Sequence, residues 1–316
     1  MLFTQKMKIS DIESFQEQVL KGQDLPDYLV HLFENLKIEI DLPGIDEEEL
    51  NIYFLENTLK IGRINSSEDK SLQPESESIV AENASTKVAR GVVGRMAETD
   101  DTVLIYGENG TGKGLFARTI HQRSVRREHP FVSVSCGAID KSNAKQQMID
   151  YLTAVGSGTL LLDGIQDMDI DTQRMLKKII RIPVEQRYFR LITTTSADLE
   201  ELAHQGDFSA ELLAILQSCY IELLPLQQRK DDIEALVTFY MEKICRSCGV
   251  EPKNFSPDLL RMLESYPWPG NVLELVNTVE QLLMTAQEKR TLFAKDLPTH
   301  IRIQTINSSA AQKKGI

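Results

Sequence analysis

The amino-acid sequence predicts an α/β fold, in which a five-stranded parallel sheet is preceded by a small N-terminal region and followed by an all-helical subdomain. Between residues 79 and 228, short apolar runs alternate with longer segments of helical periodicity. This alternation is typical of a parallel sheet that helices cover on both faces. Beyond residue 229 only helical periodicity remains, and Pro267, Pro269 and Gly270 interrupt it.

The predicted strands are short and nearly continuously apolar, as buried parallel strands are. They are expected at residues 102–106, 131–134, 159–163, 189–195 and 219–223. Apolar residues at helical spacing predict the helices between them, at residues 85–98, 112–127, 141–153, 169–181 and 197–217. In the helical subdomain, helices are expected at residues 229–247, 256–265 and 270–288.

A change of composition marks the start of the folded core. Residues 64–78 are rich in Ser and Glu and poor in apolar side chains, which is typical of a linker. The predicted organisation is an N-terminal region at 1–63, the linker, an α/β core at 79–228, a helical subdomain at 229–303 and a flexible tail at 304–316.

The N-terminal region has two interpretations. Asp46 can cap a helix that continues to residue 60, or residues 50–54 and 58–61 can form a hairpin that turns at Glu56 and Asn57. The sequence does not choose between them, so the fold and role of residues 1–63 stay unassigned.

Composition argues against several classes of function. The chain has 316 residues, with 35 Lys and Arg against 47 Asp and Glu, and a formal net charge of −12. Unselective binding to DNA or RNA requires clustered cations, so we do not expect it. No apolar run approaches the roughly 18 residues of a membrane span, and the N-terminus lacks an apolar signal segment. Four cysteines in this length favour the reducing cytoplasm, with Cys245 and Cys248 expected to pack at a helix end.

A glycine-rich turn at residues 107–114 follows the first strand and opens a helix. In this Walker A context, glycines let backbone N–H groups converge on phosphate oxygens, and a lysine reaches the outer phosphates. The strict motif ends in Ser or Thr, so Gly114 departs from it, and a turn without a ligand is the alternative. The predicted nucleotide-binding residues are Gly107, Glu108, Asn109, Gly110, Thr111, Gly112, Lys113 and Gly114.

An apolar strand that ends in a carboxylate follows some 50 residues later, at Asp163. In nucleotide-binding proteins an aspartate in this place holds Mg²⁺, commonly through water. Asp163 is therefore the predicted Mg²⁺ residue, and the predicted metal binds together with the nucleotide.

Together with ProPheValSerValSerCys at 130–136, ArgLeuIleThrThrThrSerAlaAspLeu at 190–199 and TyrProTrpProGlyAsnVal at 266–272, these motifs resemble the AAA+ domain of bacterial sigma-54-dependent transcription activators. The resemblance covers about residues 79–303. It implies an AAA+ P-loop core with a helical lid, and ATP or ADP with Mg²⁺ as cofactors. It also adds Ile79 and Val80, where the domain opens, to the predicted nucleotide-binding residues. The family forms rings, so a homo-oligomer is one expectation.

The same resemblance identifies the catalytic positions that this chain has changed, which makes its AAA+ domain a degenerate one. Gly164 stands in place of the glutamate that polarises the attacking water, and Ser209 and Ile215 stand in place of two arginine fingers. Ser196 replaces the sensor asparagine, and Leu273 replaces the lid arginine. A general base is worth about 10² to 10⁴ in rate and an arginine finger about 10³ to 10⁵. We therefore predict no catalytic residues and expect hydrolysis to be slow or absent.

Two inserted loops of the family also have no counterpart. Residues 139–158 lack the GAFTGA loop that touches sigma-54, residues 181–189 lack the second pore loop, and no helix-turn-helix follows the lid. We expect an ATP-binding regulatory protein that touches neither sigma-54 nor enhancer DNA directly and acts through a protein partner, such as an intact AAA+ activator. Two alternatives stay open. One is an interaction scaffold that binds no nucleotide, and the other is an active sigma-54 activator in which Asp167 supplies the missing carboxylate.

Overall fold

A computed structural model describes residues 79–182, 187–285 and 289–305 of the chain. The predictions for the N-terminal region, the linker and residues 306–316 of the tail therefore lie outside the described residues. The core contains one sheet of five parallel strands in the order β2-β3-β4-β1-β5. These are β1 (Val103–Tyr106), β2 (Phe131–Ser135), β3 (Thr159–Asp163), β4 (Arg190–Thr195) and β5 (Tyr220–Glu222). Every strand boundary lies within one residue of its predicted place.

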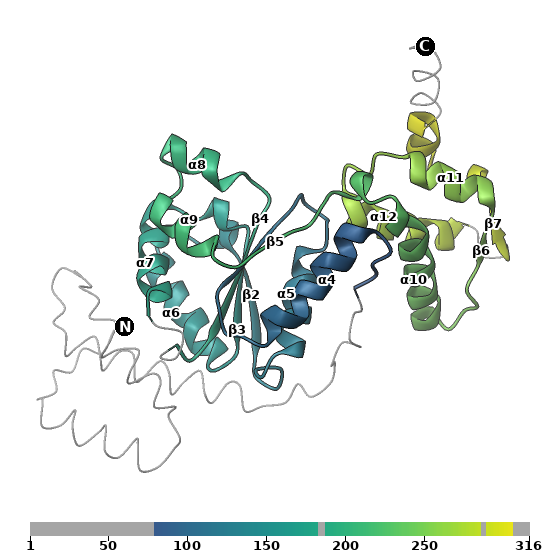
Figure 1. The fold of residues 1–316 in the computed structure, drawn as a ribbon. Coiled ribbons are helices and arrows are strands. Elements are labelled where there is room, and N and C mark those ends of the chain that lie inside the picture. The colour runs from purple at the N-terminus through teal and green to yellow at the C-terminus, as the bar shows by residue number, and fades with distance from the viewer. Residues whose placement is uncertain (1–78, 183–186, 286–288, 306–316) are drawn as a thin grey trace, which may run out of the picture.

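Helices cover both faces of this sheet (Figure 1). On one face α4 (Ala84–Ala97) and α5 (Lys113–Arg123) pack against Ile105 and Leu161. On the other face α6 (Ala144–Val155), α7 (Ile170–Ile180) and α9 (Ala210–Leu216) pack against Leu104 and Leu160. Neighbouring strand residues thus enter different layers, because successive side chains of a strand point to opposite faces.

The helix predicted at residues 197–217 is wrong as a single element. It is two helices, α8 (Leu199–Gln205) and α9, which are separated at Gly206. Gly206 takes a left-handed conformation with φ of 86°, which suits glycine and ends a helix. Asp198 caps the start of α8 and Ser209 caps the start of α9, each through its side-chain oxygen. The helix predicted to reach residue 127 also ends early, at Arg123.

The lid is helical, with one departure from the predicted all-helical subdomain. Its helices α10 (Asp231–Cys248), α11 (Pro257–Ser265) and α12 (Asn271–Thr285) surround the fully buried Trp268. The departure is a short parallel pair, β6 (Asn254–Phe255) with β7 (Thr291–Leu292). Residues 299–305 are helical, so the lid continues past its expected end at residue 303. Four short 3-10 turns complete the description: η1 (Cys136–Ala138), η2 (Ile165–Asp167), η4 (Leu226–Gln228) and η5 (Ala294–Asp296).

One buried carboxylate joins the start of the core to the lid. Asp232, at the start of α10, accepts hydrogen bonds from the backbone N–H groups of Glu82 and Asn83 and from the Thr86 hydroxyl. Asp232 is fully buried, so these bonds replace the water that the carboxylate loses. The contact fixes α4 beside α10, as Figure 1 shows.

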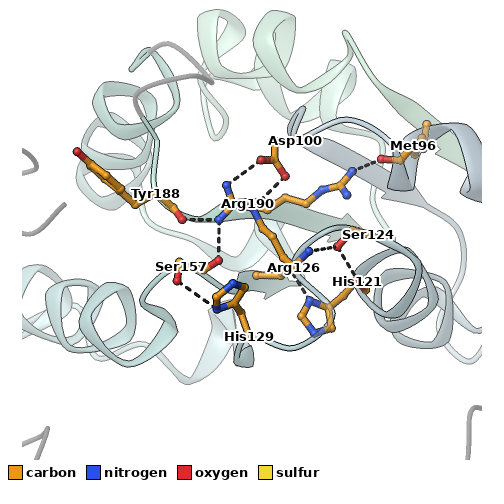
Figure 2. A network of polar contacts seen from close by, with 10 residues as sticks. Met96, Asp100, His121, Ser124, Arg126, His129, Ser157, Tyr188 and Arg190 are labelled. Atoms are coloured by element: carbon orange, nitrogen blue, oxygen red, sulfur yellow. Dashed lines mark hydrogen bonds and ion pairs between the residues drawn. The ribbon is translucent and has the colours of Figure 1, made fainter. Parts of the chain in front are cut away.

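A charged network closes the amino end of the sheet (Figure 2). Arg126 binds both carboxylate oxygens of Asp100 and donates to the carbonyl oxygens of Ser157 and Tyr188. The hydrogen bond from Arg126 lowers the pKa of the Asp100 carboxyl. The fully buried Arg190 donates to the carbonyl of Met96, and burial lowers its pKa.

Among the described residues, no helix combines the length and apolarity of a membrane span.

Candidate functional site

A pocket of about 740 Å³ lies where the carboxyl ends of the strands meet the lid. In open parallel sheets this edge is the usual place for ligands. Three parts of the chain build its walls: the glycine-rich loop, the residues that follow β2, β3 and β4, and one face of the lid. The lining residues are Asn109, Gly110, Gly112, Lys113, Gly114, Ser135, Asp163, Gly164, Gln166, Asp167, Ser196, Tyr240, Val272, Leu273 and Val276.

The loop after β1 has the backbone shape that phosphate binding needs. Gly112 is the N-cap of α5, with φ of 105°, and Gly110 has φ of 79°. Both values lie in the left-handed region, where glycine carries no steric penalty. The turn therefore leads directly into the N-terminus of α5, whose first N–H groups and partial positive charge favour an anion.

The side chain of Lys113 folds back onto this loop. Its Nζ donates to the carbonyl oxygen of Gly107 at 2.7 Å and to that of Glu108 at 3.0 Å. Partial burial lowers the pKa of Lys113, and the negative charges of Asp163 and Glu108 oppose that shift. The ammonium group is thus held at the pocket by two neutral carbonyl oxygens, and no carboxylate forms an ion pair with it among the described residues.

Asp163 stands at the end of β3, and Thr194 of β4 orients it. The Thr194 hydroxyl donates to Asp163 Oδ1 and accepts from the backbone N–H of Gly164 at 3.1 Å. One threonine therefore fixes both the carboxylate and the first residue after the strand. Asp163 is itself exposed to the pocket, so its second oxygen is free for a hydrated cation.

Gly164 and Asp167 share one corner of the pocket. Gly164 has φ of 75°, and a Cβ atom built on it would lie 2.9 Å from Asp167 Oδ2. The Asp167 carboxylate therefore occupies the space into which a side chain at position 164 would project. Both Asp163 and Asp167 add to the effect of burial in raising the pKa of the Cys136 thiol, to about 12. The two carboxylates give this corner of the pocket a negative charge.

The predicted nucleotide-binding residues fall into three groups. Lining the pocket are Asn109, Gly110, Gly112, Lys113 and Gly114, with the predicted metal residue Asp163. Gly107, Glu108 and Thr111 belong to the same loop, where their polar groups bind other protein groups. Ile79 is buried against α4 and α5, while Val80 packs against the lid core. Neither is among the residues that line the pocket.

The positions at which the resemblance implies a changed catalytic residue fall into two groups. Ser196 and Leu273 line the pocket, and Leu273 is 61% exposed there. Ser209 instead caps α9 by accepting from the N–H of Leu212, and Ile215 packs against the core. Ser209 and Ile215 thus have structural roles within this chain.

On the lid side of the pocket, sequence reasoning identified Leu273 and missed the other residues. Tyr240, Val272 and Val276 line it, but they lie on α10 and α12, at the same helical spacing as core residues. No local signal distinguishes them. Asn271 was also missed, although it lies in a turn-forming Pro-Gly-Asn sequence and Asn tolerates the left-handed backbone that it adopts.

Comparisons with known proteins agree with this geometry. Residues 79–151 and 142–222 match the family described as Sigma-54 interaction domain, and residues 227–314 match the AAA+ ATPase lid domain. The chain is 31% identical to the DNA-binding transcriptional regulator NtrC of Proteus hauseri, over 73% of this chain and 54% of that protein. It is 33% identical to the nitrogen assimilation regulatory protein NtrX of Azorhizobium caulinodans, over 62% of this chain and 48% of that protein.

Solved structures give the same result. The crystal structure of NtrX from Brucella abortus in complex with ATP has a TM-score of 0.65 and 26% identity, covering 82% of this chain and 62% of that one. Its complex with ADP has a TM-score of 0.64 at the same identity, covering 82% of this chain and 64% of that one. The chain spans about half the length of the curated relatives it matches.

Proposed function

Because the chain belongs to the family of sigma-54 interaction domains with an AAA+ lid, we propose that it is a regulatory protein that binds ATP or ADP and hydrolyses it poorly or not at all. The observation that carries this proposal is the pocket itself. It combines Lys113 and the N-terminus of α5 with Asp163, while a glycine follows that aspartate. The binding groups are present and the expected general base is replaced.

Binding and catalysis are separable in this way because only interactions that strengthen in the transition state accelerate a reaction. The loop glycines, Lys113 and the helix N-terminus stabilise bound phosphates whether or not a bond breaks. Gly164, Ser196 and Leu273 bring no charge to the region where the third phosphate would lie. The proposed pocket therefore holds a nucleotide as a ligand that shifts the population of conformations.

Mg²⁺ is part of the proposal as a companion of the nucleotide. Asp163 fits the role, because Thr194 orients its carboxylate and the pocket leaves its second oxygen accessible. Gly114 supplies no hydroxyl ligand, and the Thr111 hydroxyl already donates to the carbonyl of Glu108. The ion would thus be held by Asp163, by water and by the phosphates, as is usual for Mg²⁺ with nucleotides.

The proposed mode of action is through a protein partner in transcription regulation. The relatives named above are transcriptional and nitrogen-assimilation regulators. In this chain residues 139–158 form the approach to α6, α6 itself and the approach to β3, which leaves no inserted loop there. An intact AAA+ activator is the proposed partner class, because such a protein would share the same subunit surfaces.

Titration calorimetry with ADP, and with ATP in the presence and absence of Mg²⁺, tests the binding half of the proposal. We expect binding in the micromolar range and a loss of about 10- to 150-fold in Lys113→Ala, since hydrogen bonds to charged groups contribute roughly 1.5–3 kcal/mol. Lys145→Ala, an exposed lysine on α6, is the matched control and should bind as the natural chain does. If neither nucleotide binds, the chain is an interaction scaffold instead.

Asp167 favours one second candidate, a slow ATPase. Its carboxylate lies beside Gly164 in the pocket, where it can accept a proton from water. Phosphate release measured on the natural chain, Lys113→Ala and Asp167→Asn decides between the two. Steady release that both variants abolish supports the ATPase, and release at the background rate in all three supports the regulator.

A further inference from the structure

The lid holds the phosphate loop by its backbone carbonyl oxygens. Three consecutive carbonyls of the loop, those of residues 109, 110 and 111, each accept a hydrogen bond from the lid or from Arg229, which lies between η4 and α10. The donors are Asn271 Nδ2 to Asn109 O at 2.9 Å, the Leu273 N–H to Gly110 O at 3.3 Å, and Arg229 Nη2 to Thr111 O at 2.8 Å. Every loop peptide between Asn109 and Gly112 is thus tied to the lid.

Asn271 is the centre of this contact. Its side chain is fully buried, and its amide uses both ends. Nδ2 donates to Glu108 Oε2 at 3.0 Å as well as to Asn109 O, and Oδ1 accepts from the Leu226 N–H at 2.7 Å. Leu226 begins the η4 turn that leads from the core into the lid. One amide therefore joins the loop, the start of α12 and the connection between core and lid.

Beside the pocket, the loop and the lid are in direct contact at Gly110. A Cβ atom on Gly110 would lie 2.2 Å from the carbonyl oxygen of Gly270, far inside contact distance. Asn271 has φ of 51°, a left-handed value that Asn tolerates better than most residues. The backbone on both sides is therefore shaped for this contact, and a shift of the loop displaces the lid.

Peptide geometry connects this contact to the ligand. Each peptide unit is planar, so its carbonyl and its N–H point to opposite sides. The carbonyls of residues 109–111 belong to the same units as the N–H groups of Gly110, Thr111 and Gly112. Gly110 and Gly112 line the pocket, where phosphate oxygens attract their N–H groups, while the Thr111 N–H donates to the Glu108 carbonyl oxygen at 3.3 Å. Rotation of a unit toward phosphate then moves its carbonyl on the lid side.

We propose that Asn271 is a positioning residue through which the lid responds to occupancy of the phosphate loop, so that a nucleoside diphosphate and a triphosphate order the lid alike. This inference rests on the proposed nucleotide binding and specifies how it regulates. At the positions beyond Lys113, Gly164 and Leu273 carry no charge and Asp167 carries a carboxylate, so none of these three offers a positive charge to a third phosphate. The signal is the presence of a diphosphate group on the loop.

Hydrogen–deuterium exchange on the full chain tests this proposal, with ADP and with a non-hydrolysable ATP analogue, each with Mg²⁺. In the natural chain we expect both ligands to slow exchange in the loop and in α12, with protection factors that agree within about twofold. In Asn271→Asp, which keeps the acceptor oxygen but loses the donor, the loop should stay protected while the protection of α12 disappears. Asn271→Gly, which suits the positive φ, serves as a second variant if the first does not fold.

The matched control is Asn277→Asp, an exposed position on the same helix, which should respond as the natural chain does. Protection of α12 by the ATP analogue but not by ADP would overturn the inference, because the lid would then respond to the third phosphate. So would unchanged protection of α12 in both variants at position 271. Calorimetry on the same samples distinguishes failure of this inference from failure of the proposed function. If the chain binds no nucleotide, the proposed function itself is contradicted.

Discussion

The two ends of the central sheet carry similar polar side chains and use them in opposite ways. At the amino end, Arg126 binds Asp100 and two backbone carbonyls of the chain itself. At the carboxyl end, Lys113 and Asp163 face a pocket of about 740 Å³. Charge is neutralised by the protein at one end and is left for a ligand at the other.

This difference teaches that residue type alone does not identify a site. A buried guanidinium must be paired, because its desolvation costs several kcal/mol. At the amino end the chain supplies that partner to Arg126, whereas the buried Arg190 donates to the Met96 carbonyl and leaves its Nε and Nη1 without a hydrogen-bond partner among the described residues. At the carboxyl end Lys113 and Asp163 line the pocket, so their charged groups stay accessible. We therefore expect substitutions at the amino end to change stability and those at the carboxyl end to change binding.

The largest effect is expected at the amino end, from Arg126→Ala. Removing this guanidinium leaves Asp100 and two carbonyls without their donor, so the free energy of unfolding should fall by about 3–5 kcal/mol. Nucleotide affinity of the folded protein should not change. Urea denaturation measures the loss, with Arg127→Ala as the control. Arg127 is 66% exposed and pairs with the exposed Glu128, so about 0.5 kcal/mol or less is expected. Weakened binding in Arg126→Ala would contradict the separation of the two ends.

Gly110→Ala should have the next largest effect, at the carboxyl end. The left-handed backbone costs about 1–2 kcal/mol for alanine, and the clash with Gly270 adds to it. Gly114→Ala is the matched control, because its Cβ meets nothing within 4 Å and helical glycine is less favourable than alanine by about 0.5–1 kcal/mol. Denaturation should show opposite signs for the two variants. Equal destabilisation would show that the loop and the lid are not in contact.

Gly164→Glu tests the carboxyl end of the sheet directly, since it adds a carboxylate to the pocket. We expect a loss of about 1–2 kcal/mol, because φ at this position is 75° and Asp167 occupies the space. Phosphate release should stay at the level of the natural chain. Adding Asp167→Ala should recover part of the lost stability. A single variant that hydrolyses ATP faster than the natural chain would show that the site accepts the glutamate.

The smallest effect is a pH dependence at the amino end. Arg126 lowers the pKa of Asp100 below its ordinary value of 3.8. A carboxyl with a lowered folded pKa stabilises the fold above its unfolded pKa, and this contribution is lost as pH falls below about 3.8 through the folded pKa. Unfolding of the natural chain and of Asp100→Asn between pH 5 and 2 measures it. The free energy of unfolding should change less with pH in the variant than in the natural chain. Identical slopes in the two would show that Asp100 does not cause the pH dependence.

Much of the core could be predicted because its signals are local. Each buried parallel strand is a short apolar run, and the loop at 107–114 is a contiguous motif, so strand boundaries and the pocket residues of the loop followed from the sequence. The helix at 197–217 was overextended, because the single Gly206 was not read as a helix end. The β6–β7 pair is only two residues a strand, too short for any periodicity to reveal.

The lid side of the pocket could not be predicted for a different reason. Tyr240 and Val276 lie more than 100 residues from the loop, and only the packing of α10 and α12 brings them to it. Asn271 combines three contacts with residues 45, 162 and 163 positions away. Such long-range hydrogen bonds have no pattern along the chain. Ile79 and Val80, which came from resemblance alone, contact hydrophobic clusters instead of the pocket surface.

The carbonyl contacts between loop and lid have a consequence for how this chain tolerates mutation. Every residue carries the same backbone oxygen, so exchanges of the side chains of Asn109 and Thr111 leave the acceptors of these bonds in place. Catalytic groups such as a glutamate or an arginine finger disappear with one codon change. Contacts made by backbone oxygens therefore persist through side-chain exchanges that would remove a contact made by a glutamate or an arginine side chain.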